Sequence, residues 1–283
     1  MIWSLMSMNT ETRAQQYGVT ERATADTTSA RHAERIGLAG YTVLPGGFAG
    51  SDIADMGRRL DAVMETQVHE FGGADRMAAI GDELTARCPL AYDEIFLRIA
   101  AHAELLDLVR EILGQYVVLT QQNGVFNAPG QGHAQRAYHR DLPYQHFVST
   151  RPLAVSALFC VDAFTAETGA TTVIPGSHRL EMFPSDAVAA ELDTTVIAEP
   201  GSFIVFDSML FHRAGANRSS GVRRAVNHVF AVPIIAQQIS LPAALGGKYA
   251  DDPRLAQLLG YDVAPAPSVV AWRARRLGRD HVE

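Results

Sequence analysis

A histidine and an aspartate, His139 and Asp141, stand two residues apart in the stretch from Tyr138 to Phe147. Successive side chains of an extended strand point to opposite faces, so these two project from one side while Arg140 points away. An imidazole and a carboxylate on one side supply two ligands of the two-histidine, one-carboxylate triad that binds non-haem Fe(II). The third ligand must come from elsewhere in the chain.

The same residues match a second motif. His139-Arg140-Asp141-Leu142 begins like the catalytic loop of protein kinases, H-R-D-L-x-x-x-N. His146 occupies the Asn position, and the sequence has no G-x-G-x-x-G, no D-F-G and no A-P-E. The kinase hypothesis therefore fails.

The composition favours an enzyme-sized protein with a small-molecule ligand. The chain has 283 residues, of which 47% are hydrophobic, enough for one large domain with a sizeable core. A net charge of -7 argues against nucleic acid or a membrane surface as partner. Without a charged, apolar leader or a run long enough to span a bilayer, we expect a cytoplasmic protein. Cys88 and Cys160 are interpreted as small buried hydrophobic residues.

Helices are expected in the first third of the chain, after a polar and mobile lead-in over residues 1–28. Apolar residues recur at spacings of three and four from residue 51 or 52 to 68 and again over 101–113, and a further helix is expected over 30–38. A short strand follows at 41–44, whereas residues 72–100 carry no clear pattern. Residues 29–283 are expected to form a single domain.

The rest of the chain is dominated by short strands separated by turns. Many such strands behind a helical segment predict a mainly β fold, a sandwich or jelly-roll barrel, whose mouth could hold a small ligand. Within the first strand, Gln121-Gln122-Asn123 is either an exposed strand face or the polar wall of a cavity. Residues 234–283 lack strand alternation and have no assigned role, and the basic run at 272–279 is interpreted as a solvated helix face. The expected strands cover 116–126, 153–161, 171–174, 202–206 and 225–232.

His212, at the end of an apolar strand, is a candidate for the third ligand. A lone histidine there is more often structural, but a strand about seventy residues after the H-x-D can lie opposite it in a folded barrel. Arg223 follows eleven residues later and can face the same cavity. Arginine geometry suits bidentate binding of a carboxylate.

Taken in order, these segments resemble the phytanoyl-CoA dioxygenase-like group of Fe(II)- and 2-oxoglutarate-dependent oxygenases, over residues 30 to 233. The matching parts are the early helix with Gly40-Tyr41-Thr42-Val43-Leu44, the His139-Arg140-Asp141 triplet, the run from Gly169 to Arg179 containing Pro175-Gly176-Ser177-His178, and the run from Phe211 to Asn217 leading to Arg223-Arg224-Ala225.

The resemblance implies a double-stranded β-helix, a jelly-roll core of the cupin kind, with Fe(II) on His139, Asp141 and His212. It also implies 2-oxoglutarate as cosubstrate, its distal carboxylate paired with Arg223. Gln122 resembles the family residue that hydrogen-bonds the cosubstrate, and Thr171 is a weaker candidate. Arg224 is the alternative anchor, although strand alternation turns it outward if Arg223 faces in.

The remaining histidines are given no metal role. Ser177 and His178 are interpreted as structural, and His133, His146 and His228 have no spacing that favours ligation. The aromatic residues around the triplet are expected either to line the substrate entrance or to pack as a loop. These are Tyr138, Tyr144, His146 and Phe147.

By resemblance, the reaction consumes O2 and 2-oxoglutarate and releases succinate and CO2. Family halogenases carry a small residue in place of the carboxylate, so Asp141 favours hydroxylation. Desaturation, epoxidation, ring closure and epimerisation stay open, as does the oligomeric state. The polar residues near the motif suggest a polar or amphipathic substrate, such as a natural-product intermediate, and no Lys or Arg cluster indicates a CoA nucleotide. The alternatives are a metal-dependent barrel that does not use 2-oxoglutarate and a non-catalytic binding barrel.

Overall fold

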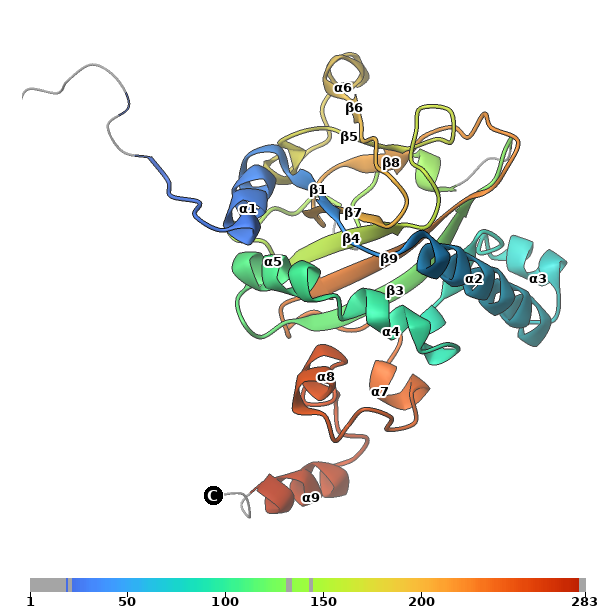
Figure 1. Ribbon diagram of the computed structural model, residues 1–283. Helices are drawn as coiled ribbons and strands as arrows, with labels where there is room; N and C mark the ends of the chain where they lie inside the picture. The colour runs from blue at the N-terminus through green and yellow to red at the C-terminus, as the bar shows by residue number, and fades with distance from the viewer. Residues whose placement is uncertain (1–18, 20–21, 131–133, 143–144, 280–283) are drawn as a thin grey trace, which may run out of the picture.

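Two antiparallel β-sheets form the centre of the protein. The computed structural model describes residue 19 and residues 22–130, 134–142 and 145–279. The strands of the larger sheet are β1 (Tyr41–Pro45), β2 (Thr85–Arg87), β3 (Val118–Asn127), β4 (Ala154–Cys160), β7 (Ser202–Asp207) and β9 (Arg223–Ala231), and those of the smaller sheet are β5 (Thr171–Val173), β6 (Thr194–Thr195) and β8 (His212–Ala214). Their orders are β1-β7-β4-β9-β3-β2 and β6-β5-β8 (Figure 1).

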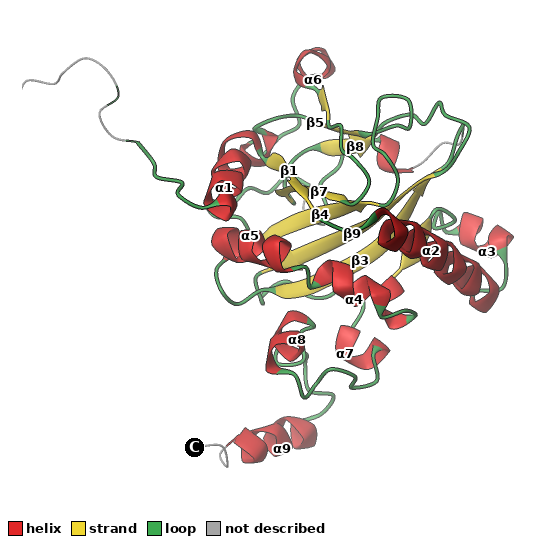
Figure 2. Ribbon diagram, in the orientation of Figure 1, coloured by secondary structure: helices red, strands yellow, loops and turns green. Residues whose placement is uncertain are grey.

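Helices cover one face of the larger sheet, and the smaller sheet lies toward the other face (Figures 1 and 2). The covering helices are α1 (Thr28–Ala39), α2 (Gly50–Glu70), α4 (Ile95–Ala100) and α5 (Ala103–Leu113), with α3 (Ala74–Ala79) beside them, and short 3-10 turns lie at η1 (Pro89–Ala91), η2 (Ala134–Arg136) and η3 (Ser177–Arg179). The later helices are α6 (Asp186–Leu192), α7 (Leu241–Ala244), α8 (Pro253–Leu258) and α9 (Val269–Arg279). The predicted class, mainly β with flanking helices around a jelly-roll core, is confirmed.

Strands β1, β4, β7 and β9 of the larger sheet each contribute to two separate cores. Phe159, Phe203 and Phe230 are fully buried against the helices, beside Leu60 of α2 and Leu108 of α5. The alternate residues of the same strands pack between the two sheets, in a cluster with Val173 of β5. That inner cluster includes Cys160, Ile204, Phe206 and Ala225. Since side chains alternate along a strand, the inner-facing positions are the ones that can build a site between the sheets.

A β-bulge in β3 decides which of its polar residues face inward. Leu119 pairs with Phe230 on the helix-covered face, and the next paired residue is Gln121, opposite Val229 on the inner face. Thr120 is the extra residue, so the alternation reverses there. Gln121 and Asn123 therefore face inward, whereas Gln122 faces the helices.

Most of the predicted helices and strands are present, with four differences. The second helix begins at Gly50 with Ala49 as its N-cap, so Ser51 and Asp52 lie inside its first turn. Residues 72–100, which had no assignment, contain α3, β2, η1 and α4. The H-x-D is not part of a regular strand, and His212 begins a strand where the sequence suggested the end of one. Of the lead-in, nearly all lies outside the described residues.

The C-terminal segment closes one end of the helix-covered core and then leaves it. Leu241, Leu258 and Leu259 are buried with the main core, whereas α9 exposes Val270, Trp272 and Leu277. The predicted absence of strands is confirmed for residues 234–279. Among the described residues, no helix combines the length and apolar character needed to cross a membrane.

Candidate metal centre and cosubstrate site

His139, Asp141 and His212 come together between the sheets. Their ligand atoms all lie within 4.8 Å of one another, the only such group of three or more metal-binding side chains found in the described part of the chain. Asp141 Oδ1 lies 3.9 Å from Nε2 of His139 and 3.4 Å from Nε2 of His212. Two nitrogen donors and one carboxylate oxygen directed at one point are the set that suits Fe(II).

Backbone pairing brings the two histidines together. His139 forms an isolated antiparallel bridge with His212, in which each amide N–H donates to the other carbonyl at 2.9 and 3.1 Å. The Asp141 amide donates to the Ser208 carbonyl at 3.0 Å, which ties the loop to the turn before β8. The predicted extended strand is wrong, but the bridge and this bond still place both side chains toward His212.

The second nitrogen of each histidine determines its tautomer. Nδ1 of His139 lies 2.9 Å from the Ala137 carbonyl, and Nδ1 of His212 lies 3.0 Å from the Leu210 carbonyl. Because a carbonyl can only accept, both Nδ1 atoms carry the proton. Each Nε2 is then left with a lone pair for a metal, as is usual for metal-binding histidines.

The Asp141 carboxylate is held by its outer oxygen. Oδ2 accepts hydrogen bonds from Ser156 Oγ at 2.6 Å and Asn227 Nδ2 at 3.2 Å. Since Ser156 gives its proton to Asp141, Ser208 Oγ must donate to Ser156 across 2.8 Å. Burial by itself would raise the pKa of Asp141, but the neighbouring histidines and the Ser156 hydroxyl hold that pKa well below its usual value. The carboxylate therefore presents Oδ1, charged, toward both imidazoles.

Arg223 is buried and forms no ion pair with any described residue. Its side chain begins β9 on the inner face, is 3% exposed and places its guanidinium 4.0 Å from the centre of the Phe164 ring. Nε and Nη1 have no hydrogen-bond partner among the described residues. Burial lowers the pKa of this guanidinium to about 10. A buried cation with unused donors is costly unless an anion binds there.

Arg224 points the other way, as strand alternation predicts. Its guanidinium pairs with Asp162 at 2.9 Å and with Asp61 of α2 at 2.8 Å. Arg224 therefore links the sheet to the helix layer. Of the two neighbouring arginines, Arg223 is the one on the inner face.

Three asparagines line the inner face between Asp141 and Arg223. Asn227 faces Asn123 in the β3–β9 ladder, and Asn127 faces Arg223. The side-chain oxygens of all three are buried and have no partner within the described ranges. The four residue steps along the strand from Arg223 to Asn227 cover roughly 13 Å. A small dicarboxylate fits this arrangement, because one end could reach the histidines and the other a guanidinium.

Gln122, predicted to bind the cosubstrate, does not face this space. Its Oε1 accepts from the Leu90 amide at 2.8 Å, and its Nε2 donates to the Phe96 carbonyl at 2.9 Å. The bulge at Thr120 turns it toward the helices, so this assignment is wrong. Asn123, its neighbour, occupies the inner position, and a sequence analysis would have found it only by anticipating the bulge. Thr171 pairs with Ala214 and shares the inner face with Val173.

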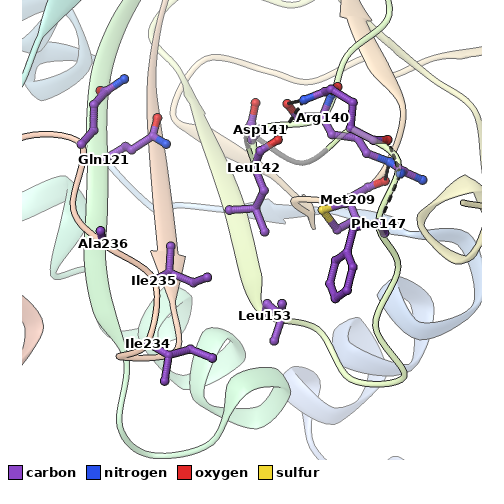
Figure 3. A pocket seen from close by; sticks show the side chains of 12 residues that line it. Gln121, Arg140, Asp141, Leu142, Phe147, Leu153, Met209, Ile234, Ile235 and Ala236 are labelled. Carbon is purple, nitrogen blue, oxygen red and sulfur yellow. Dashed lines mark hydrogen bonds between the residues drawn. The ribbon is translucent and has the colours of Figure 1, made fainter.

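A cavity of about 850 Å³ opens beside Asp141 (Figure 3). Of the aromatic residues named above, Phe147 lines this cavity, whereas His146 is exposed and is not among the lining residues. Tyr144 lies outside the described residues. Tyr138 was expected at the entrance but packs against Phe183 and donates to Asp193 at 3.0 Å, because its side chain leaves the loop on the side of α6.

The residues assigned structural roles have identifiable contacts. Ser177 Oγ accepts from the Phe211 amide at 3.0 Å, next to His212. A Cβ at Gly40, where φ is +89°, would lie 2.8 Å from His178 and 2.5 Å from Leu210, so only glycine fits there. His228 is fully buried on the helix-covered face, and burial lowers its pKa to about 4.

Several solved structures share this fold. EctD from S. alaskensis matches with a TM-score of 0.60 and 25% identity over 75% of this chain and 80% of that one. A second EctD structure, with 2-oxoglutarate and 5-hydroxyectoine, has a TM-score of 0.59 over 76% and 80% of the two chains. The epimerase SnoN, at 19% identity and a TM-score of 0.55 over 72% and 84%, shares the fold.

Sequence relatives agree with this placement. An uncharacterized protein of Mycobacterium tuberculosis, Rv1501, is 33% identical over 237 residues, which are 81% of this chain and 85% of that one. The dioxygenase trt7 of Aspergillus terreus is 43% identical over 76 residues, 26% of each chain. The profile of phytanoyl-CoA dioxygenase (PhyH) matches residues 37–225, a span that contains the triad and Arg223. The chain belongs to the phytanoyl-CoA dioxygenase (PhyH) family of oxygenases.

Proposed function

We propose that this protein is an Fe(II)- and 2-oxoglutarate-dependent dioxygenase that hydroxylates an unactivated C–H bond of a polar or amphipathic small molecule. Succinate and CO2 are the co-products. The observation that carries the proposal is the buried guanidinium of Arg223, with Nε and Nη1 unpaired among the described residues, on the same face as the triad. An iron barrel without an acidic cosubstrate has no need of this costly group.

Each residue of the site has a stated task in this proposal. His139, Asp141 and His212 hold the iron through Nε2, Oδ1 and Nε2, the atoms that lie close together at the site. Arg223 binds the distal carboxylate of 2-oxoglutarate, and Asn123 and Thr171 line its path. When bound, iron and 2-oxoglutarate supply the oxidation by O2, while the protein orients the reactants and excludes water.

Hydroxylation is favoured over halogenation because Asp141 occupies the third ligand position with a charged oxygen. EctD has been solved with 2-oxoglutarate and a hydroxylated compound, 5-hydroxyectoine, which supports hydroxylation on this fold. A natural-product intermediate as substrate and a cytoplasmic location are part of the proposal.

The test is an anaerobic titration of Fe(II)-loaded protein with 2-oxoglutarate, followed by the visible charge-transfer absorption of the complex. The wild-type protein should develop the band. Asp141→Ala should bind no iron and therefore show no band. Arg223→Ala should need at least about tenfold more 2-oxoglutarate to develop the band, since a charged hydrogen-bonded pair is lost. Arg224→Ala is the matched control, because the neighbouring arginine faces the helices. It should keep the band and lose thermal stability.

Two results would overturn the proposal. Absence of the band while iron is demonstrably bound would favour a barrel enzyme that does not use 2-oxoglutarate. An unchanged 2-oxoglutarate requirement in Arg223→Ala would remove the anchor on which the proposal depends.

A further inference from the structure

Among the described residues that line the cavity beside Asp141, there are apolar side chains and amide donors but no cation with free donors. We infer that the substrate is an uncharged, mainly apolar molecule that carries a hydrogen-bond-accepting oxygen, recognised by Gln121 and Gln238. This inference rests on the proposed function for the meaning of the cavity as a substrate site.

Apolar side chains make up most of the cavity wall (Figure 3). Two large ones are exposed although they line a cavity, Ile234 at 80% and Phe147 at 46%. Exposed apolar side chains that gather at one cavity indicate a ligand that covers them. The other apolar lining residues are Leu142, Leu153, Met209, Ile235 and Ala236.

Arg140 is the one cation among the described lining residues, and the protein already uses it. Its Nε donates to the Met209 carbonyl at 2.7 Å, Nη1 to the Gln145 carbonyl at 2.5 Å, and Nη2 to the carbonyls of Ser177 and Leu180. The guanidinium also lies 3.9 Å from the centre of the Phe211 ring. It holds the metal-binding loop in place and has little left to offer an anionic substrate.

The amide groups of the wall are directed by Asn123. Its Nδ2 donates to Oε1 of Gln121 at 3.4 Å and to Oε1 of Gln238 at 3.2 Å. With their oxygens engaged, both glutamines present NH2 groups, and neither NH2 has a partner in the part of the chain that the structure describes. Gln145 is not available, because its amide bonds to the backbone of Arg140 and Leu142.

Charge selection follows from these contacts. A carboxylate, sulfate or phosphate inside this cavity would lose its water and find no side-chain cation with free donors among the described lining residues, which is costly. A ketone, lactone or hydroxyl oxygen needs only the two amide donors, which match it. Neutral acceptors are therefore favoured over anions of the same shape.

Matched ligand pairs test this inference in the full-length protein, by saturation-transfer NMR and calorimetry without iron or turnover. The pairs are 2-dodecanone with dodecanoate, camphor with camphor-10-sulfonate, and dehydroepiandrosterone with its 3-sulfate. At least one neutral member should bind about tenfold more tightly than its anionic partner, and no pair should show the reverse. An anion that binds as tightly as its neutral partner, or no saturable binding by any neutral member, would overturn the inference.

Three variants locate the binding. Gln121→Leu should weaken ketone binding by about two- to tenfold, the range expected for one neutral hydrogen bond. Leu153→Arg adds a cation to the cavity wall and should allow the anionic probes to bind. Gln257→Leu on α8, outside the cavity, is the control and should change the binding of neither ketones nor anions. Unchanged ketone binding in Gln121→Leu would contradict recognition by that amide. Because the probe experiment uses no metal, it can fail independently of the anaerobic titration. Selective binding of neutral probes without a charge-transfer band would contradict only the dioxygenase proposal. A charge-transfer band without such binding would contradict only the inference about the substrate.

Discussion

At the scale of single residues, the orientation of Asp141 depends on side chains that do not touch the metal position. Ser156 and Asn227 both donate to its outer oxygen, and Ser208 orients Ser156. Such supporting hydrogen bonds typically contribute 10–100-fold to metal affinity. They therefore belong to the metal centre as much as the three ligands do.

We expect Ser156→Ala and Asn227→Ala each to weaken metal binding by about 10–100-fold, because Asp141 loses a donor that fixes its rotamer. Calorimetric titration with Ni(II) measures the affinity without air oxidation. Ser219→Ala, in an exposed turn, is the control and should bind as the wild type does. Equal affinities in all four proteins would mean that Asp141 needs no such support.

Substitutions of the neighbours Gln122 and Asn123 should have different effects, the first on stability and the second on the 2-oxoglutarate requirement. Gln122→Met should cost about 3 kcal/mol of unfolding free energy, because it leaves the Leu90 amide and the Phe96 carbonyl buried without partners. Its 2-oxoglutarate requirement should stay unchanged. Asn123→Ala should raise that requirement with a smaller loss of stability. Urea denaturation and the anaerobic titration separate the two, and the reverse pattern would restore Gln122 to the cosubstrate site.

At the scale of elements, the end of β7 carries a buried acid that makes stability depend on pH. Asp207 is 5% exposed, and burial raises its pKa to about 6, although the Met209 amide and the guanidiniums of Arg140 and Arg179 act against this. A folded-state pKa above the unfolded value of 3.8 means that the native state binds the extra proton. The stabilisation that comes from this proton on Asp207 is thus complete below about pH 4 and is lost as the pH rises through 6.

Asp207→Asn should remove this dependence. The amide oxygen can still accept from the Met209 amide, which now reaches Asp207 Oδ1 at 2.9 Å, so the fold is kept. The variant should gain about 2–3 kcal/mol over the wild type between pH 4 and pH 8, from a pKa difference of about two units. Urea denaturation at pH 4, 6 and 8 gives this difference. A constant difference across the three pH values would show that the pKa of Asp207 is the same in the folded and unfolded states.

At the scale of the whole molecule, the C-terminal segment has two parts with different roles. Residues 234–236 and Gln238 line the cavity, and Leu241, Leu258 and Leu259 complete the core. By contrast, α9 has exposed apolar residues and bonds to its own neighbourhood in the chain, as from Arg275 to the Ala264 carbonyl. The first part should be needed for folding and the second should not.

A protein ending at Ser268, which lacks α9, should keep the melting temperature and the 2-oxoglutarate requirement of the full chain. A protein ending at Ser240 loses three buried leucines, each worth about 2–5 kcal/mol, and should not fold at 37 °C. Thermal unfolding followed by circular dichroism compares them. Destabilisation by the first truncation would place α9 in the folded core.

The order of helices and strands could largely be predicted from the chain, because periodicities of two and of three to four are local properties. The pattern predicted β4, β5, β7 and β9 within one or two residues at most ends. Residues 72–100 could not be assigned, because their short elements are stabilised by distant partners, such as the pairing of Thr85 with Val125. The stretch around His139, in the loop after β3, was wrongly predicted as an extended strand for a similar reason. His139 pairs there in an isolated bridge with His212, which is distant in the sequence.

The sequence by itself determined which chemical groups the site contains and their order: a histidine and a carboxylate two residues apart, a later histidine and an arginine pair. It also determined, by strand alternation, that Arg223 and Arg224 face opposite sides. Only the tertiary structure decided that Gln122 turns away, that Arg140 donates to backbone carbonyls, and that residues 234–236 and Gln238 line the cavity. These outcomes depend on a bulge and on contacts between residues distant in the chain, and neither leaves a periodic pattern in the sequence.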